Sequence, residues 1–283
     1  MSTIEKAINK LSKKGADLGA VVTDVPSSEG GAEPMSGFEN TKPLLQGDPF
    51  RILEEQGFRL SVVEKNQMKE EFRHIKRPLL RTAAGLGADV VDNGNVIMVA
   101  SGMSGEGKTF TSVNLAFSIA MEKDKTVLLI DADVEKSALS RVFGVESEPG
   151  LADYLLGETN KLADVIFSSE LDNLKILPAG QNSEHSTELY SSGNMVSLMN
   201  ELSQRYSDRI IILDLPPLLL TSEAIMLAGL AGQIVMVIES HSLQADVKNA
   251  VSLFDSSQII GLVMNKFSGE SRSYYYGAPV AQE

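Results

Sequence analysis

The sequence predicts an α/β fold, with a mostly parallel sheet flanked by helices and preceded by a flexible N-terminal region. Three observations predict it: apolar runs of strand length after Asn95, helix-length segments between them, and a glycine-rich motif directly after the first run. The runs are rich in Val, Ile and Leu, which fits strands buried on both faces and joined by right-handed crossover helices. The expected strands are residues 96–100, 126–130, 174–177, 209–213, 233–238 and 259–263.

The chain is expected to have four parts. Residues 1–14 are amphipathic and predict a helix that docks on a partner or frays at the terminus, rather than a membrane anchor. Residues 15–50 are rich in Gly, Ser, Pro, Glu and Asp without periodicity, which indicates a flexible linker. A nucleotide-binding domain is expected over residues 51–267, followed by a C-terminal tail over residues 268–283.

Composition excludes several classes of function. Lys and Arg number 25 against 38 Asp and Glu, and a net charge of -13 disfavours binding to nucleic-acid phosphates. The chain has no Cys, so disulfides and thiolate metal sites are excluded. No apolar stretch reaches the length that spans a bilayer. We therefore expect a cytoplasmic protein, or one attached to a membrane through something else.

The strongest motif lies between the first expected strand and an amphipathic helix. It reads GMSGEGKT over residues 102–109, which is the GxxxxGK(S/T) spacing of a phosphate-binding P-loop. Its glycines let the backbone approach phosphates, the helix N-terminus favours negative charge, Lys108 pairs with β and γ oxygens, and Thr109 ligates Mg²⁺. The alternative is a glycine-rich turn that binds nothing, and the complete strand, motif and helix argue against it.

The motif therefore predicts ATP and Mg²⁺ as ligands. We expect Lys108 to lie on an exposed loop without a packing role. The expected nucleotide contacts are Gly102, Ser104, Gly105, Glu106, Gly107, Lys108, Thr109 and Phe110.

Three acids are expected at the same edge of the sheet. Asp131 and Asp133 end the run VLLIDAD, and Asp214 ends the run IIILDLPP. Each acid alone would be taken as a turn former or a cap. Parallel strands bring their carboxyl ends to one edge, however, so the three carboxylates should converge on the P-loop.

Such acids suit a magnesium-dependent transfer reaction. Mg²⁺ prefers oxygen ligands and keeps several waters, so we expect Thr109, Asp131 and Asp214 around the metal. One acid remains free to orient an attacking hydroxyl and accept its proton. The expected catalytic residues are Lys108, Asp131, Asp133 and Asp214.

A charged helix is expected ahead of the domain, over residues 65–77, with Pro78 ending or kinking it. Glu70, Arg73 and Arg77 share one face of this helix. An apolar stripe lies on another face and consists of Phe72, Ile75 and Leu79. Taken alone, the pattern indicates a solvated helix with salt bridges.

The C-terminal tail carries three consecutive tyrosines, Tyr274, Tyr275 and Tyr276. Gly, Ser and Pro flank them without an alternating apolar pattern, which indicates a mobile tail rather than a strand. On composition alone, packing of the rings on a neighbouring surface is the favoured interpretation.

Together, the P-loop at 102–109, IDAD at 130–133, ILDLPP at 212–217, the helix with Glu70 and Arg73, and the tyrosine tail resemble the bacterial tyrosine kinases. These are the P-loop autokinases of exopolysaccharide export. The resemblance covers roughly residues 60–283, and the layout is most similar to the exosortase-associated tyrosine autokinase group. It implies a P-loop NTPase fold and transfer of the γ-phosphate of Mg·ATP to the tail tyrosines of a neighbouring subunit, which regulates exopolysaccharide synthesis or export.

The resemblance also implies partners and further site residues. It implies that Asn265 lies near the adenine, and that a homo-oligomer, as a ring, forms through Glu70, Arg73, Lys76 and Arg77. The implied partners are a membrane chain-length-determining polysaccharide co-polymerase, which also activates the kinase, and a phosphotyrosine phosphatase. The implied location is cytoplasmic and peripheral at the inner membrane, through a protein partner.

Two departures from the family pattern and two competing functions remain. Glu135 stands where the family carries an Arg after the second Asp, and Lys76 stands where the assembly motif ends in Arg. One competing function is a nucleotide-switch ATPase of the partitioning or septum-site type, but Met103 occupies the place of the additional lysine in those proteins. The other is a non-catalytic ATP-binding assembly factor with a vestigial tail.

Overall fold

The computed structural model describes residues 61–87, 91–159, 161–181, 190, 193–205, 209–255 and 257–267. The expected helix over residues 1–14, the linker over 15–50 and the tail over 268–283 lie outside these ranges. None of the helices within them is both long enough and apolar enough to cross a membrane.

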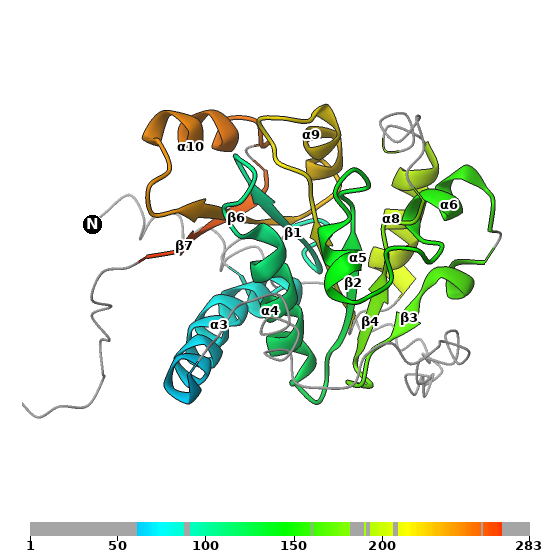
Figure 1. Cartoon of the computed structure of the whole chain (residues 1–283), viewed down its shortest axis with the longest axis horizontal. Helices are drawn as coiled ribbons and strands as arrows, with labels where there is room; N and C mark the ends of the chain where they lie inside the picture. Colours follow the sequence, from blue (N-terminus) through cyan, green and yellow to red (C-terminus); the bar gives the residue numbers. More distant parts are fainter. Residues whose placement is uncertain are drawn as a thin grey trace, which may run out of the picture. The chain divides into compact units, whose positions relative to one another are not determined.

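A sheet of seven strands in the order β3-β4-β2-β5-β1-β6-β7 forms the centre of the domain (Figure 1). The strands are β1 Val96–Ser101, β2 Thr126–Asp131, β3 Phe167–Ser168, β4 Leu174–Leu177, β5 Arg209–Asp214, β6 Gln233–Glu239 and β7 Ile259–Asn265. All neighbouring pairs are parallel except β3 and β4. The predicted mostly parallel sheet is confirmed, and the two-residue β3 is an addition.

Helices cover both faces of the sheet. They are α3 Val62–Ala83, α4 Lys108–Ala120, α5 Ala138–Val142, α6 Leu151–Leu156, η1 Leu162–Val165, α8 Gly193–Arg205, α9 Ser222–Ala228 and α10 Gln244–Val251. Alternate residues of a strand point to opposite faces, so Ile97 and Val99 pack in the core with α3, α4 and α5. Val96 and Met98 pack in the other core, with α6, α8, α9 and α10.

Helix α3 is longer than expected and packs beside α4 (Figure 1). A capping box at Ser61 and Glu64 starts it, and it runs through Pro78 to Ala83. Of the two expected effects of Pro78, ending the helix was wrong, and kinking it stays a prediction. Proline removes one backbone donor, but the turn after it is held by packing, because Leu79 is buried in the core and its carbonyl accepts a hydrogen bond from Gln233 Nε2 at 3.0 Å.

The topology brings the functional segments to one edge. β1 lies between β5 and β6, and β5 lies between β1 and β2. In the register of β2 with β5, Asp131 lies opposite Asp214. The P-loop follows β1 directly, so the loop and both acids occupy the carboxyl edge of the sheet, where ligands bind in open α/β folds.

Candidate active site

The P-loop turns from β1 into α4 through residues that only glycine suits. Gly107 has φ 99°, in the left-handed region, and a Cβ there would lie 1.9 Å from Asn265 Nδ2. Asn265, the last residue of β7, donates a hydrogen bond from Nδ2 to the Glu106 carbonyl oxygen at 2.9 Å. The end of β7 therefore packs directly against the P-loop, as the parallel topology predicts.

Glu106 uses its side chain to hold the loop itself. The carboxylate is buried, accepts a hydrogen bond from the Met103 backbone N–H at 2.8 Å, and accepts another from Ser242 Oγ. Ser242 lies between β6 and α10. The side chain thus ties the P-loop to the loop after β6, a role that the sequence spacing did not indicate.

Lys108 is the first residue of α4 and is 9% exposed, so the expectation of an exposed loop lysine was wrong. Its Nζ lies 3.2 Å from Asp133 Oδ2. Burial alone would lower the pKa of the ammonium, but Asp214, Asp133 and Asp131 together raise that pKa above its usual value. The lysine is therefore held in its charged form, aimed at the acids.

Asp214 is fully buried at the end of β5 and joins the P-loop helix to the sheet. Its Oδ2 accepts a hydrogen bond from Thr109 Oγ1 at 2.6 Å, and its Oδ1 accepts one from Ser112 Oγ at 3.0 Å. Burial raises the pKa of this carboxyl, while Lys108 and the two hydroxyl donors oppose the rise.

Asp131 is fully buried and bonded to three donors. Its Oδ2 accepts from Ser140 N–H at 2.8 Å and from Ser140 Oγ at 2.7 Å, and its Oδ1 accepts from the Asp133 backbone N–H at 3.1 Å. Burial, and next the charge of Asp214, raise the pKa of Asp131 to about 7. Ser140 lies in α5, nine residues after Asp131, and no sequence motif marks that pairing.

These oxygens suit a magnesium ion. Thr109 Oγ1 and an Asp214 oxygen lie within 2.6 Å of each other, so one cation could contact both with water completing its shell. Within the described ranges, no group of three or more His, Cys, Asp or Glu residues could hold a metal by itself. Thr109 and Asp214 could therefore hold an Mg²⁺ ion, and Asp131 lies opposite Asp214 in the register of the sheet.

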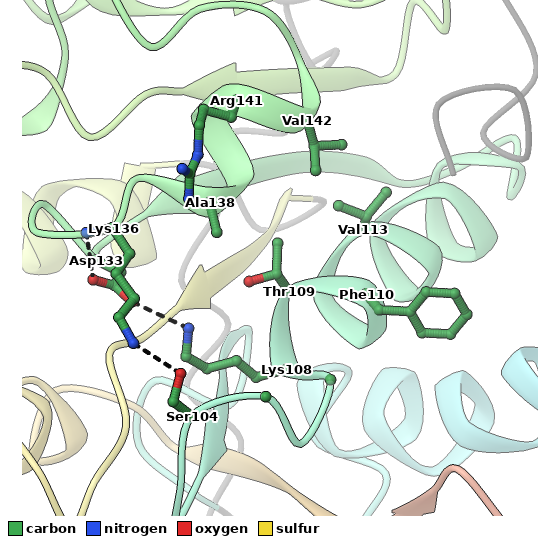
Figure 2. A pocket seen from close by; sticks show the side chains of 12 residues that line it. Ser104, Lys108, Thr109, Phe110, Val113, Asp133, Lys136, Ala138, Arg141 and Val142 are labelled. Atoms are coloured by element: carbon green, nitrogen blue, oxygen red, sulfur yellow. Dashed lines mark hydrogen bonds and ion pairs between the residues drawn. The ribbon is translucent and has the colours of Figure 1, made fainter. Parts of the chain in front are cut away.

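A pocket of about 550 Å³ opens beside the P-loop (Figure 2). Lys136 Nζ donates to Ser104 Oγ at 2.8 Å, and the Lys136 backbone N–H donates to Asp133 Oδ1 at 3.1 Å. The lining residues are Ser104, Gly105, Gly107, Lys108, Thr109, Phe110, Val113, Asp133, Lys136, Ala138, Arg141 and Val142. Sequence reasoning missed the contribution of α5 to this wall, because a helix of five residues has no periodicity to reveal its orientation.

The predicted oligomer residues on α3 fall on different faces. Glu70 and Arg73 are exposed and form an ion pair with each other, and Arg77 is exposed as well. Lys76 is only 6% exposed, and its Nζ pairs with Glu122 Oε1 at 2.6 Å and donates to the Ser118 carbonyl oxygen. Lys76 therefore ties α3 to the end of α4 within the chain.

Comparison with known proteins identifies the family. The CobQ/CobB/MinD/ParA nucleotide binding domain family matches residues 97–277. YwqD of Bacillus subtilis, a tyrosine-protein kinase, is 34% identical over 187 residues, which cover 64% of this chain and 77% of YwqD. This chain belongs to that nucleotide-binding family and, within it, to the bacterial tyrosine-protein kinases. EpsB of Ralstonia nicotianae is 32% identical over 70% of this chain, but the chain spans only 26% of EpsB.

Solved structures of this kinase family share the fold. The VpsO kinase domain superposes with a TM-score of 0.60 at 30% identity and covers 73% of this chain and 100% of that domain. The kinase domain of Escherichia coli ETK has a TM-score of 0.57 at 28% identity, covering 65% of this chain and 72% of that domain.

A protein outside the kinases also shares the fold. The septum-site protein MinD of Pyrococcus horikoshii, complexed with Mg-ADP, has a TM-score of 0.52 at 27% identity, covering 61% of this chain and 70% of MinD.

Proposed function

We propose that this bacterial tyrosine kinase is an autokinase that transfers the γ-phosphate of Mg·ATP to Tyr274, Tyr275 and Tyr276 of a neighbouring copy. The observation that carries the proposal is the joining of three strand ends at the P-loop: Lys108 pairs with Asp133, and Thr109 hydrogen-bonds Asp214. A P-loop, a lysine and carboxylates at this spacing suit phosphoryl transfer, in which catalysis is mostly positioning and charge stabilisation.

The residues divide the work as follows. The backbone N–H groups at the start of α4 bind phosphate oxygens, and Lys108 neutralises charge on the β and γ oxygens. Thr109 and Asp214 would hold Mg²⁺, which would supply positive charge against the phosphates of ATP. A carboxylate of the Asp131 and Asp133 pair accepts the phenolic proton.

The transfer forms one bond to the γ-phosphorus and breaks another. The tyrosine oxygen forms a bond to the γ-phosphorus, the bond between that phosphorus and the β,γ-bridging oxygen breaks, and ADP leaves with those electrons.

The tail supplies the acceptor in this proposal because β7, the strand that precedes it, ends beside the P-loop. Asn265 contacts the Glu106 carbonyl, and Lys266 follows it. From Lys266 to Tyr274 is eight residues, a reach of at most about 26 to 29 Å. A neighbour's tail reaches a site without having to fold back on its own domain, so transfer between copies is preferred.

The same proposal includes assembly and regulation. The exposed face of α3 with Glu70, Arg73 and Arg77 is the surface for self-association into a ring, and Lys76 is left out because it is bound within the chain. Each phosphotyrosine adds about -1.5 to -2 charges to a protein already at -13, so phosphorylation loosens the oligomer. The kinase lies in the cytoplasm at the membrane surface, where a membrane polysaccharide co-polymerase activates it. A phosphotyrosine phosphatase reverses the reaction. The regulated process is exopolysaccharide synthesis or export.

The experiment is to incubate purified protein with Mg·ATP and locate phosphate by mass spectrometry. The proposal predicts phosphotyrosine on residues 274–276 and none in Lys108→Met. ATP turnover to ADP and free phosphate without phosphotyrosine would instead support the nucleotide-switch ATPase, which the fold shared with MinD keeps as the second candidate. Binding of ATP with neither product would support the assembly factor.

A further inference from the structure

Helix α5 forms a fixed wall over the pocket beside the P-loop. The turn into it passes through Ser137 at φ 43° and ψ 41°, a left-handed conformation that costs a non-glycine residue energy. Ser140 anchors the helix through two hydrogen bonds to Asp131, and Leu139 is fully buried in the core. A strained turn held by such contacts indicates that the orientation of α5 is set by its surroundings.

Arg141 stands on this wall and faces the pocket. In Figure 2, Arg141 and Ala138 project from α5 on the side of Lys136, whereas Val142 lies beside Val113. The Arg141 side chain is exposed, and its guanidinium forms no hydrogen bond or ion pair with any part of the chain that the structure describes.

The other two cations of the pocket are already engaged. Lys108 pairs with Asp133 at 3.2 Å, and Lys136 donates to Ser104 at 2.8 Å. An unengaged guanidinium on a fixed support is preorganised for an anion, and its planar fork binds two phosphate oxygens at once. Arg141 is thus the pocket cation free to meet an incoming phosphate.

The position of Arg141 determines which phosphate group of ATP its guanidinium can contact. The backbone N–H groups of the P-loop hold the β-phosphate, and Lys108 spans the β and γ oxygens. Asp133 pairs with Lys108 and is followed within a few residues by the start of α5, so a γ-phosphate bound by Lys108 would lie next to this wall.

We propose that Arg141 is a further catalytic residue that contacts the γ-phosphoryl oxygens of ATP and stabilises the charge they carry during transfer. This deepens the proposed function and rests on it for the transfer step. As the tyrosine oxygen bonds to the γ-phosphorus and the bridging bond breaks, the phenolic proton passes to the Asp131 and Asp133 pair. Arg141 only balances charge and takes no proton, because a guanidinium stays protonated throughout.

The test compares nucleotides with and without a γ-phosphate. Calorimetry gives the dissociation constants of Mg·ADP and of Mg with the non-hydrolysable analogue AMP-PNP for wild type, Arg141→Ala and Arg141→Lys. Arg141→Ala should weaken AMP-PNP about ten- to hundredfold, the range for a lost hydrogen bond to a charged group, and change ADP by less than about twofold. Arg141→Lys should fall between, since it keeps the charge and loses the fork.

Arg81→Ala is the matched control, because Arg81 is an exposed arginine in the last turn of α3 and does not line the pocket. It should leave both affinities unchanged. In rate measurements, Arg141→Ala should lower kcat for phosphotyrosine formation more than it raises KM for ATP. Thermal unfolding of each variant checks that the fold is retained.

Three results would overturn the proposal: equal weakening of ADP and AMP-PNP, no weakening of either, or loss of phosphotyrosine with an unchanged ratio of the two affinities. The last result would assign Arg141 to the acceptor. If wild type forms no phosphotyrosine, the autokinase proposal fails, but the affinity ratio still tests Arg141 separately.

Discussion

Asp131→Asn should make the nucleotide-free protein more stable relative to wild type as the pH rises. In the folded chain, burial and Asp214 raise the pKa of Asp131 from its usual 3.8 to about 7. The folded state therefore holds a proton that the unfolded state has lost across this interval. A group with a raised folded pKa stabilises the fold at low pH, and that contribution is lost as the pH rises from about 4 to about 7.

The structure gives the size of the effect. Each pH unit within this interval costs wild type about 1.4 kcal/mol of unfolding free energy, so the change from pH 5.5 to 7.5 is about 2 kcal/mol. Asparagine does not titrate, so its stability lacks this slope. The variant also gives up at least one of the three hydrogen bonds to the carboxylate, which costs about 1 to 3 kcal/mol at every pH. The difference in unfolding free energy between variant and wild type at a single pH therefore depends on how many hydrogen bonds are lost. The change of that difference with pH reports the titration of Asp131.

The assay is urea unfolding of Mg²⁺-free, nucleotide-free protein at pH 5.5, 6.5 and 7.5. From pH 5.5 to pH 7.5, the unfolding free energy of Asp131→Asn should rise by about 2 kcal/mol relative to that of wild type. Asp92→Asn, at an exposed position, is the control and should show a constant difference. A constant difference for Asp131→Asn as well would contradict the raised pKa, because it would mean that Asp131 titrates alike in the folded and unfolded chains.

Three further substitutions test the site and the assembly surface. Lys108→Met should abolish phosphotyrosine formation, because it removes the cation that pairs with Asp133. Circular dichroism should show that the variant keeps its fold. A normal phosphotyrosine yield from the folded variant would contradict the catalytic role of Lys108. Asp214→Asn should lower the phosphorylation rate by at least about tenfold, because it removes a charge beside Thr109. Asp92→Asn is the control and should keep the wild-type rate. Equal rates for the two variants would contradict a metal site at Asp214. Glu70→Lys should weaken self-association by placing like charges together, and ultracentrifugation with unchanged sedimentation would favour a merely solvated helix.

Much of the sheet was predictable from the sequence because its strands are long apolar runs. Six expected strands agree with the structure to within two residues at each end. Five of them are largely buried, which requires apolar residues along the run. The expectation of burial on both faces was wrong for β7, which is an edge strand with Leu262 and Met264 exposed. β3 was missed because two residues carry no pattern. The end of α3 was misjudged because the local effect of Pro78 is outweighed by the burial of Leu79.

The site was predictable at the level of residue types and less so at the level of contacts. The P-loop and the three acids follow from motif spacing and from the parallel sheet, which places strand ends together. Lys108 was expected to be exposed, but the converging carboxylates surround it. Contacts from Ser140, Ser242 and Arg141 depend on how short segments pack after the strands end, and no periodicity in the sequence encodes that packing.

Transfer between copies is tested most directly by mixing two variants that are each unable to phosphorylate themselves. Lys108→Met keeps the tail and lacks the catalytic cation, and the variant with Tyr274, Tyr275 and Tyr276 all changed to Phe keeps the site and lacks the acceptors. With Mg·ATP, we expect phosphotyrosine on residues 274–276 of the Lys108→Met chain, found by mass spectrometry after the two chains are separated by different affinity tags. No phosphotyrosine on that chain, under conditions where wild type phosphorylates its own tail, would contradict transfer between neighbouring copies.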